Sequence, residues 1–131
     1  GAGGVHVGQG DLPPREVRRI VGPRALVGYS THNLAQLTLG LAEPVDYVAV
    51  GPVYPTSTKA AADPVVGTAL VEQARRRTTL PLVAIGGIGP ENAADVIAAG
   101  ADGIAVIGAL FGAADLAAAV RRFRQAVPRL Q

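Results

Sequence analysis

The sequence predicts an α/β protein in which helices cover a parallel sheet. Short runs rich in Val, Ile and Leu alternate along the chain with longer helical patterns, and the runs lack regular polar alternation. Such runs are typical of parallel strands with both faces covered. The chain is 49% hydrophobic but only 4% aromatic, so aliphatic side chains must form the core.

Five segments have the composition of buried strands. Because strands that alternate with helices are joined by right-handed crossovers, we expect the five strands to lie parallel in one sheet. The expected strands are GVHVG (4–8), ALVGY (25–29), YVAVG (47–51), LVAIGG (82–87) and GIAVIG (103–108).

The helical patterns between these strands have recognisable boundaries. Prolines open the helices expected at 13–21 and 90–100, since proline is tolerated in a first helical turn. Asp11 is a candidate cap for the first helix, and Asp115 or the residues just before it for the last. The remaining helices are expected at 33–43, 66–77 and 115–127.

Charge and cysteine content exclude several classes of function. The formal charge of +2 is too weak to predict nucleic-acid binding. Arginines cluster at 75–77 and 121–124, late in expected helices, where cations interact favourably with the helix dipole. We interpret them as solvated helix ends, with an anion or partner site as the alternative. The absence of cysteine excludes disulfides and thiolate metal sites.

Length and hydropathy bound the organisation. No apolar run approaches the ~20 residues of a transmembrane helix, and no signal peptide is recognisable, so we expect a cytoplasmic protein with no membrane contact. The 131 residues suffice for one core, and we expect residues 1–131 to form a single domain. The chain begins with Gly1 rather than Met, which fits a piece of a longer protein.

Two architectures accommodate alternating βα units: an open, doubly wound sheet and a (β/α)8 barrel. In both, ligands bind at the carboxyl ends of the strands. A barrel needs about 250 residues and eight units. Length alone therefore favours the open sheet, unless the chain is a fragment.

Polar residues and glycines gather where the expected strands end. Because parallel strands end at the same edge of a sheet, these residues are predicted to share one face. They are Gln9 and Asp11 after the first strand, Ser30, Thr31 and His32 after the second, Thr56, Ser57, Thr58 and Lys59 after the third, Gly86 and Gly87 after the fourth, and Gly108 after the fifth.

The glycine loops after the last two strands predict a phosphate site. Glycine lets the backbone approach a ligand, and a helix N-terminus offers free N–H groups. The alternative is that these glycines only form tight turns.

Three other residues have competing interpretations. Asp11 is either a helix cap or a Mg²⁺ ligand, because Mg²⁺ uses one or two carboxylates together with substrate phosphates. His6 lies inside a strand and is predicted to be a core or barrel-lining residue. His32 either belongs to a helix start or transfers protons.

Several motifs together resemble the second half of the thiamine phosphate synthase family. They are GVHVGQGDLP, GYSTHN, YVAVGPVYPTSTK and LVAIGGIGPENAADVIAAGADGIAVIGAL, which cover nearly the whole chain. The Thr-x-Thr-Lys loop is the most specific of them. The family fold is a TIM (β/α)8 barrel, and the resemblance starts at its fourth strand. It therefore implies that the five βα units are strands 4–8 of such a barrel.

The resemblance implies a transferase of thiamine biosynthesis. Such enzymes condense 4-amino-5-hydroxymethyl-2-methylpyrimidine diphosphate with 4-methyl-5-(2-phosphoethyl)thiazole, giving thiamine phosphate and pyrophosphate. Carried over by motif, Asp11 would bind Mg²⁺ with Gln9 beside it, while Ser30 and Lys59 would act on the pyrophosphate. The thiazole phosphate would be bound by Thr56, Thr58 and the backbone at Gly86, Gly87, Ile107 and Gly108.

The sequence departs from the family pattern in places. Gly10 replaces a common acidic residue before the metal aspartate, and Gly108 replaces a common serine, which removes a hydroxyl donor to phosphate. The family also takes a second metal carboxylate and a basic pyrimidine-diphosphate group from strands two and three, which these residues do not include. We therefore expect the isolated chain to be inactive unless it associates with a missing N-terminal half.

Two alternative functions remain open at this stage. The related thiazole tautomerase shares the fold and the IGGI region, with His32 as its acid/base catalyst, but typically lacks the Thr-x-Thr-Lys signature. The other alternative is a non-catalytic, phosphate-binding half-barrel. Its exposed edge at residues 4–8 would favour self-association.

Overall fold

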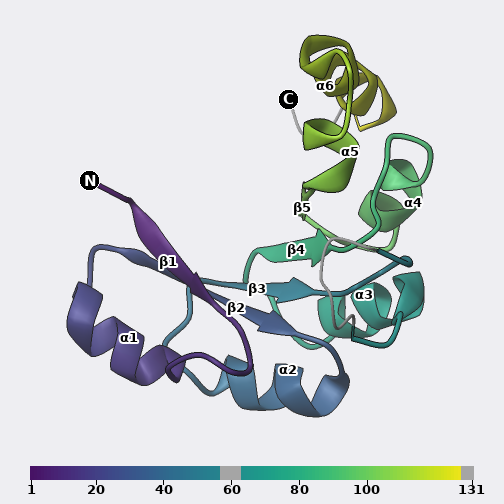
Figure 1. Cartoon of the computed structure of the whole chain (residues 1–131). Coiled ribbons are helices and arrows are strands. Elements are labelled where there is room, and N and C mark those ends of the chain that lie inside the picture. The colour runs from purple at the N-terminus through teal and green to yellow at the C-terminus, as the bar shows by residue number, and fades with distance from the viewer. Residues whose placement is uncertain (57–62, 128–131) are drawn as a thin grey trace.

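A computed structural model describes residues 1–56 and 63–127 of the chain. Its five strands form one parallel sheet in the order β1-β2-β3-β4-β5, so each strand pairs with its neighbours in the sequence (Figure 1). This confirms the expected parallel sheet of consecutive βα units. The strands are β1 (Gly4–Val7), β2 (Leu26–Thr31), β3 (Tyr47–Val50), β4 (Leu82–Ile85) and β5 (Gly103–Ala105).

The sheet is curved, and its convex face carries the helices (Figure 1). Each of the first three helices packs against the two strands that flank it in the sequence, and α6 packs against α4 and α5. None of the helices within the described ranges is long and apolar enough to cross a membrane. The helices are α1 (Pro14–Val21), α2 (Leu34–Leu41), α3 (Gly67–Arg75), α4 (Ala93–Ala98), α5 (Gly108–Phe111) and α6 (Leu116–Ala126).

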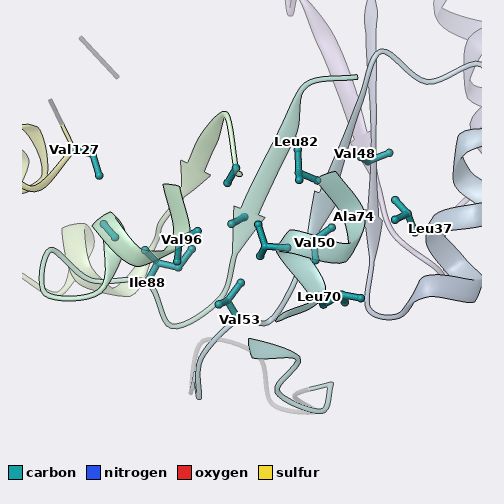
Figure 2. Close-up of a cluster of buried hydrophobic side chains, with 14 of the residues drawn as sticks. Leu37, Val48, Val50, Val53, Leu70, Ala74, Leu82, Ile88, Val96 and Val127 are labelled. Atoms are coloured by element: carbon teal, nitrogen blue, oxygen red, sulfur yellow. The ribbon is translucent and has the colours of Figure 1, made fainter. Parts of the chain in front are cut away.

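The main core lies between the sheet and these helices (Figure 2). Val48, Val50 and Leu82 of the strands share this core with Leu37 of α2 and Val71 of α3, and all five residues are fully buried. A smaller cluster of Val7, Val17 and Val27 joins α1 to β1 and β2. Aliphatic side chains thus build the core, as the low aromatic content predicts.

The element boundaries differ from expectation in ways that affect the site. Strand β2 extends to Thr31, so Ser30 and Thr31 lie inside the strand rather than after it. Thr31 can be buried because its hydroxyl donates to the carbonyl of Ala49 at 3.0 Å. The strand expected at 103–108 ends at Ala105, and the backbone turns into the short helix α5, which the sequence analysis does not predict.

The expected helix caps are partly confirmed. Asp115 caps α6 as expected, because its side chain accepts from the N–H of Ala118 at 2.9 Å. Asn33, which is not among the expected caps, accepts from the N–H of Gln36 at 2.9 Å. The prediction that Asp11 caps the first helix is wrong. Helix α1 has Pro13 at its N-cap position with no side-chain cap bond.

The expectation that both faces of the strands are covered is also wrong for the described residues. Strand valines at positions 7, 27, 48 and 50 face the convex core, whereas His6, Ser30 and Tyr47 line a cavity on the concave face. Alternating directions of successive side chains along a strand explain this division. His6, Ser30 and Tyr47 are single polar residues within apolar runs. The strand sequences therefore lack the regular polar alternation that would have indicated an uncovered face.

Two aspartates, each directly before a strand, extend the hydrogen bonding between neighbouring strands. The Asp46 N–H donates to the carbonyl of Val27 at 2.8 Å, while its carboxylate accepts from the N–H of Val27 at 2.6 Å and from Arg18 at 2.5 Å. Asp102 repeats this arrangement with Leu82, both bonds measuring 2.8 Å, and with Arg75, also at 2.8 Å. In both cases one aspartate joins a helix and two strands.

We expect Asp46→Ala to lower the free energy of unfolding by about 1 kcal/mol, because Val27 and Arg18 lose their acceptor at a partly exposed site. Urea unfolding followed by circular dichroism measures the change. Glu72→Ala is the matched control, since among the described residues the Glu72 side chain makes only an exposed ion pair with Arg76 at 3.5 Å. An equal loss in both variants would contradict a structural role for Asp46.

The Asp46 contribution is expected to depend on pH. The hydrogen bond from the Val27 N–H, followed by that from Arg18, lowers the pKa of Asp46 in the folded protein. The carboxylate therefore adds stability above its unfolded pKa of about 3.9. The stability difference between the original chain and Asp46→Ala should be full at neutral pH and shrink as pH falls below that value.

Candidate functional site

The concave face of the sheet forms a cavity of about 1210 Å³. Residues from or next to all five strands line it, and they include most of the strand-end residues singled out by the sequence. The convergence predicted from parallel topology is therefore confirmed for those that line the cavity: Gln9, Ser30, His32, Thr56, Gly86, Gly87 and Gly108. Ile107, next to Gly108, lines the cavity as well.

Hydrogen bonds join β1, β2 and β3 at one end of this cavity. The His6 ring lies between Tyr47 and Ser30, with Nδ1 2.8 Å from the Tyr47 hydroxyl and Nε2 2.7 Å from Ser30 Oγ. The Gln9 side chain donates to the Ser30 carbonyl at 2.6 Å. Ser30 is thus held at both its backbone and its hydroxyl.

Burial and charge affect the two rings differently. Partial desolvation lowers the pKa of His6, with the Asp11 charge opposing this shift. Desolvation raises the pKa of Tyr47. Both directions favour the neutral forms, a neutral imidazole and a protonated phenol.

Asp11 sits beside the cavity rather than in its wall. Its Oδ2 accepts from the N–H of Gly8 at 2.7 Å, and its own N–H donates to the Gly8 carbonyl at 3.3 Å. These bonds close the turn after β1, and no other hydrogen bond to this carboxylate comes from the described residues, so Oδ1 is left for another interaction. The described residues contain no group of three or more His, Cys, Asp or Glu side chains arranged to hold a metal. One carboxylate with a free oxygen still fits Mg²⁺, which takes much of its coordination from substrate phosphates and water.

His32 lies on the cavity wall at the end of β2. Its Nδ1 is 2.5 Å from the carbonyl of Gly51, so Nδ1 must carry the proton of that hydrogen bond. Its Nε2 lies 3.5 Å from the Asp63 carboxylate, and its backbone N–H donates to Gln36 at 2.7 Å. The ring is therefore oriented from both sides.

Close backbone contact joins the loops after β3 and β4. The N–H groups of Val53 and Tyr54 donate to the carbonyls of Ile85 and Gly86 at 2.9 and 3.1 Å. Gly87 has φ +66°, and a Cβ there would lie 2.5 Å from the Pro55 carbonyl oxygen. Glycine is required at this point for both reasons. The contact brings the Pro55 end of one loop against the glycine pair.

Asn92 holds the rest of the glycine loop. Its side chain accepts from the N–H of Gly89 at 2.9 Å and donates to the carbonyl of Gly87 at 3.2 Å. The loop shape is thus fixed within the protein. Across the cavity wall, Ile107 and Gly108 form the start of α5, and the Ile107 side chain is 60% exposed.

Some predicted site residues cannot be placed, and others were missed. Thr58 and Lys59 lie outside the described residues, as does Ser57. The sequence pattern does not identify Tyr47 as a site residue, and it predicts only a lining role for His6. The alternation of side chains could have placed His6, Ser30 and Tyr47 on one face, but only with the register between strands known.

Comparisons with known proteins agree on one family. Residues 1–110 match the family model described as thiamine monophosphate synthase. The thiamine-phosphate synthase of Methanoculleus marisnigri is 50% identical over 127 residues, covering 97% of this chain and 60% of that protein. That of Laribacter hongkongensis is 51% identical over 121 residues, covering 92% and 57%.

A solved structure gives the same result. The thiamine phosphate pyrophosphorylase from Pyrococcus furiosus superimposes with a TM-score of 0.87 at 33% identity, covering 98% of this chain and 61% of that one. This likeness confirms the expected TIM-barrel type of fold. The chain spans about 60% of the length of the curated relatives it matches.

We expect Gly87→Ala to destabilise the protein by about 2 to 4 kcal/mol, because the new Cβ meets both left-handed strain and the Pro55 carbonyl. Gly67→Ala is the matched control. Gly67 also has φ +66°, but a Cβ there would meet nothing within 4 Å, so about 1 to 2 kcal/mol is expected. Equal losses in thermal or urea unfolding would show that the loop contact contributes nothing.

Proposed function

The chain belongs to the thiamine monophosphate synthase family, and we propose that the natural protein containing it makes thiamine phosphate. The proposed reaction joins 4-amino-5-hydroxymethyl-2-methylpyrimidine diphosphate to 4-methyl-5-(2-phosphoethyl)thiazole and releases pyrophosphate in the cytoplasm. The observation that carries the proposal is the convergence of the strand-end residues on one cavity. That cavity size is ample for small phosphorylated molecules.

In the proposed reaction the bond between the pyrimidine methylene carbon and the diphosphate oxygen breaks. The thiazole nitrogen supplies the electron pair for the new carbon–nitrogen bond, and the bond electrons leave with pyrophosphate. The main demand on the protein is therefore stabilisation of the departing anion by donors and charges already in place.

We assign this task to residues of β2 and of the loops after β1 and β3. The Ser30 hydroxyl would donate to the diphosphate, and Lys59 would neutralise its charge. Gln9 supports the assignment of Ser30 because it anchors the Ser30 backbone at 2.6 Å. Asp11 would hold Mg²⁺, which when bound supplies positive charge to the diphosphate oxygens.

The thiazole phosphate is assigned to the opposite side of the cavity. Thr56 and Thr58 would donate hydroxyl hydrogen bonds, and Gly86, Gly87, Ile107 and Gly108 would contribute backbone N–H groups. The contact of Gly87 with Pro55 supports this assignment, because it places the beginning of the threonine loop beside the glycine pair. Gly86, Gly87, Ile107 and Gly108 all line the cavity.

We propose that a complete active site needs residues beyond the 131 of this chain. The relatives are longer than this chain, which spans about 60% of their length. We propose that the remaining barrel units supply a second metal carboxylate and a basic group for the pyrimidine diphosphate. An association of chains is the other source of such groups.

His32 supports a second candidate, a thiazole tautomerase-like isomerase. Its ring lines the cavity, is held by the Gly51 carbonyl and lies 3.5 Å from Asp63. Such an oriented imidazole suits acid/base chemistry. The thiamine-phosphate synthase names of the relatives favour the transferase.

The natural protein is expected to form thiamine phosphate from the two substrates with Mg²⁺. Ser30→Ala and Asp11→Asn should each lower kcat/KM by about 10- to 100-fold, since each removes an interaction with a charged group. Glu72→Gln, on the outer helix α3, is the control and should retain activity. Thiazole isomerisation without thiamine phosphate formation would contradict the transferase and support the isomerase.

The purified 131-residue chain alone is expected to show no turnover, because the proposed additional groups are lacking. The same thiamine phosphate assay, at a protein concentration where light scattering reports a monomer, measures this. Steady turnover by the monomer would show that these residues form a complete site.

A double variant separates the two candidate reactions. Thr56→Ala with Lys59→Ala should abolish pyrophosphate release if the protein is a synthase, because both substrate phosphates lose donors. An isomerase that uses His32 should keep its thiazole turnover in this variant. A coupled pyrophosphate assay and a spectroscopic thiazole assay give the two readings.

A further inference from the structure

His6, Gly28 and Tyr47 form one row across three neighbouring strands. In the register of the sheet, His6 pairs with Gly28, and Gly28 pairs with Tyr47. A Cβ built at Gly28 would lie 2.0 Å from Cζ of the Tyr47 ring and 2.4 Å from its hydroxyl oxygen. Because the middle strand carries no side chain there, the Tyr47 ring crosses it and reaches His6. The two ring centroids are 5.4 Å apart.

A neutral His6 has two ways to make its two hydrogen bonds. In one, the Tyr47 hydroxyl donates to Nδ1, and Nε2–H donates to Ser30 Oγ. In the other, Nδ1–H donates to the Tyr47 oxygen, and the Ser30 hydroxyl donates to Nε2. The two arrangements differ in where the Ser30 proton points.

The first arrangement makes the stronger pair of hydrogen bonds. A phenol is far more acidic than the alcohol of a serine, so it is the better donor to an imidazole nitrogen. An imidazole nitrogen is also a stronger acceptor than a phenol oxygen. Desolvation raises the pKa of Tyr47 and lowers that of His6, which favours the neutral side chains that both arrangements require.

In this arrangement Ser30 accepts from His6 and keeps its own proton for another acceptor. Ser30 lines the cavity, and Gln9 holds its backbone carbonyl. An anion bound in the cavity would be this acceptor, because a hydroxyl proton stabilises negative charge. With the opposite tautomer, Ser30 would present only lone pairs and would repel that anion.

We propose that Tyr47 is a positioning residue: by donating to His6 Nδ1 it keeps the His6 proton on Nε2, and thereby directs the Ser30 hydroxyl proton toward a bound diphosphate. The identity of the anion rests on the proposed function, whereas the tautomer of His6 does not. Gly28 is part of the same arrangement, because its missing side chain lets Tyr47 reach His6.

Nitrogen-15 NMR of the imidazole rings in the natural protein tests the tautomer directly. At pH 8 we expect the His6 proton on Nε2, with the signals assigned by their loss in His6→Asn. Tyr47→Phe removes the donor, and Gly28→Ala displaces the ring while keeping the phenol, so both should move proton population to Nδ1. Tyr29→Phe is the matched control, because Tyr29 packs against the cluster of Val7, Val17 and Val27 on the convex face. It should leave the His6 signals unchanged.

A proton on Nδ1 in the original protein, or unchanged His6 signals in Tyr47→Phe, would overturn the proposal. If Tyr47→Phe fails to fold, Gly28→Ala gives the same decision, since the nearest atoms to the new Cβ all belong to the Tyr47 side chain and none to the backbone. The readout needs no activity and no ligand.

Binding of inorganic pyrophosphate with Mg²⁺, measured by calorimetry, tests the consequence for Ser30. Tyr47→Phe and Ser30→Ala should each weaken binding about tenfold, the effect of one hydrogen bond to a charged group. The double variant should bind no more weakly than Ser30→Ala alone, because Tyr47 acts through Ser30. Additive losses would overturn the proposal. Failure of the original protein to bind pyrophosphate, with the Nε2 tautomer intact, would contradict the proposed function instead.

Discussion

Parallel pairing between strands that are consecutive in the sequence is the constraint on which this structure depends. Since β1 to β5 run in the same direction and in sequence order, every crossover passes over one face, and that face becomes the aliphatic core. All carboxyl ends then meet at the same edge. Residues as distant in the sequence as Gln9 and Gly108 line one cavity for this reason.

The same ladder divides each strand between two tasks. Residues on the convex face, under the helices, such as Val27, Val48 and Val50, are fully buried. They supply the hydrophobic free energy of the fold. Their neighbours in the strands face the cavity and are free to be polar. Asp46 and Asp102 sit outside this alternation. Each satisfies an N–H at the start of a neighbouring strand and binds an arginine from a helix, which ties crossovers to the sheet.

Absent side chains are as important to the site as polar ones. Gly28 leaves the space through which Tyr47 reaches His6, and Gly87 permits the contact between the loops after β3 and β4. Neither glycine binds anything through a side chain. Their effect is to let other groups approach across a strand or a loop, so that the two sides of the cavity are held by the fold before any ligand arrives. Preorganisation of this kind lowers the cost of placing donors around an anion.

The sequence by itself determined the type and order of the elements other than the short helix α5, because apolar runs, prolines and glycines are local signals. It also determined that Gln9, Ser30 and Gly86 would share one edge, since parallel topology alone requires it. Only the tertiary structure decided the rest. The bond between Asp11 and Gly8 replaced the expected helix cap, and Ser30 became part of a strand. The contact of His6 with Tyr47, 41 positions away, depends on strand register and on the space at Gly28, which no local spacing in the sequence specifies.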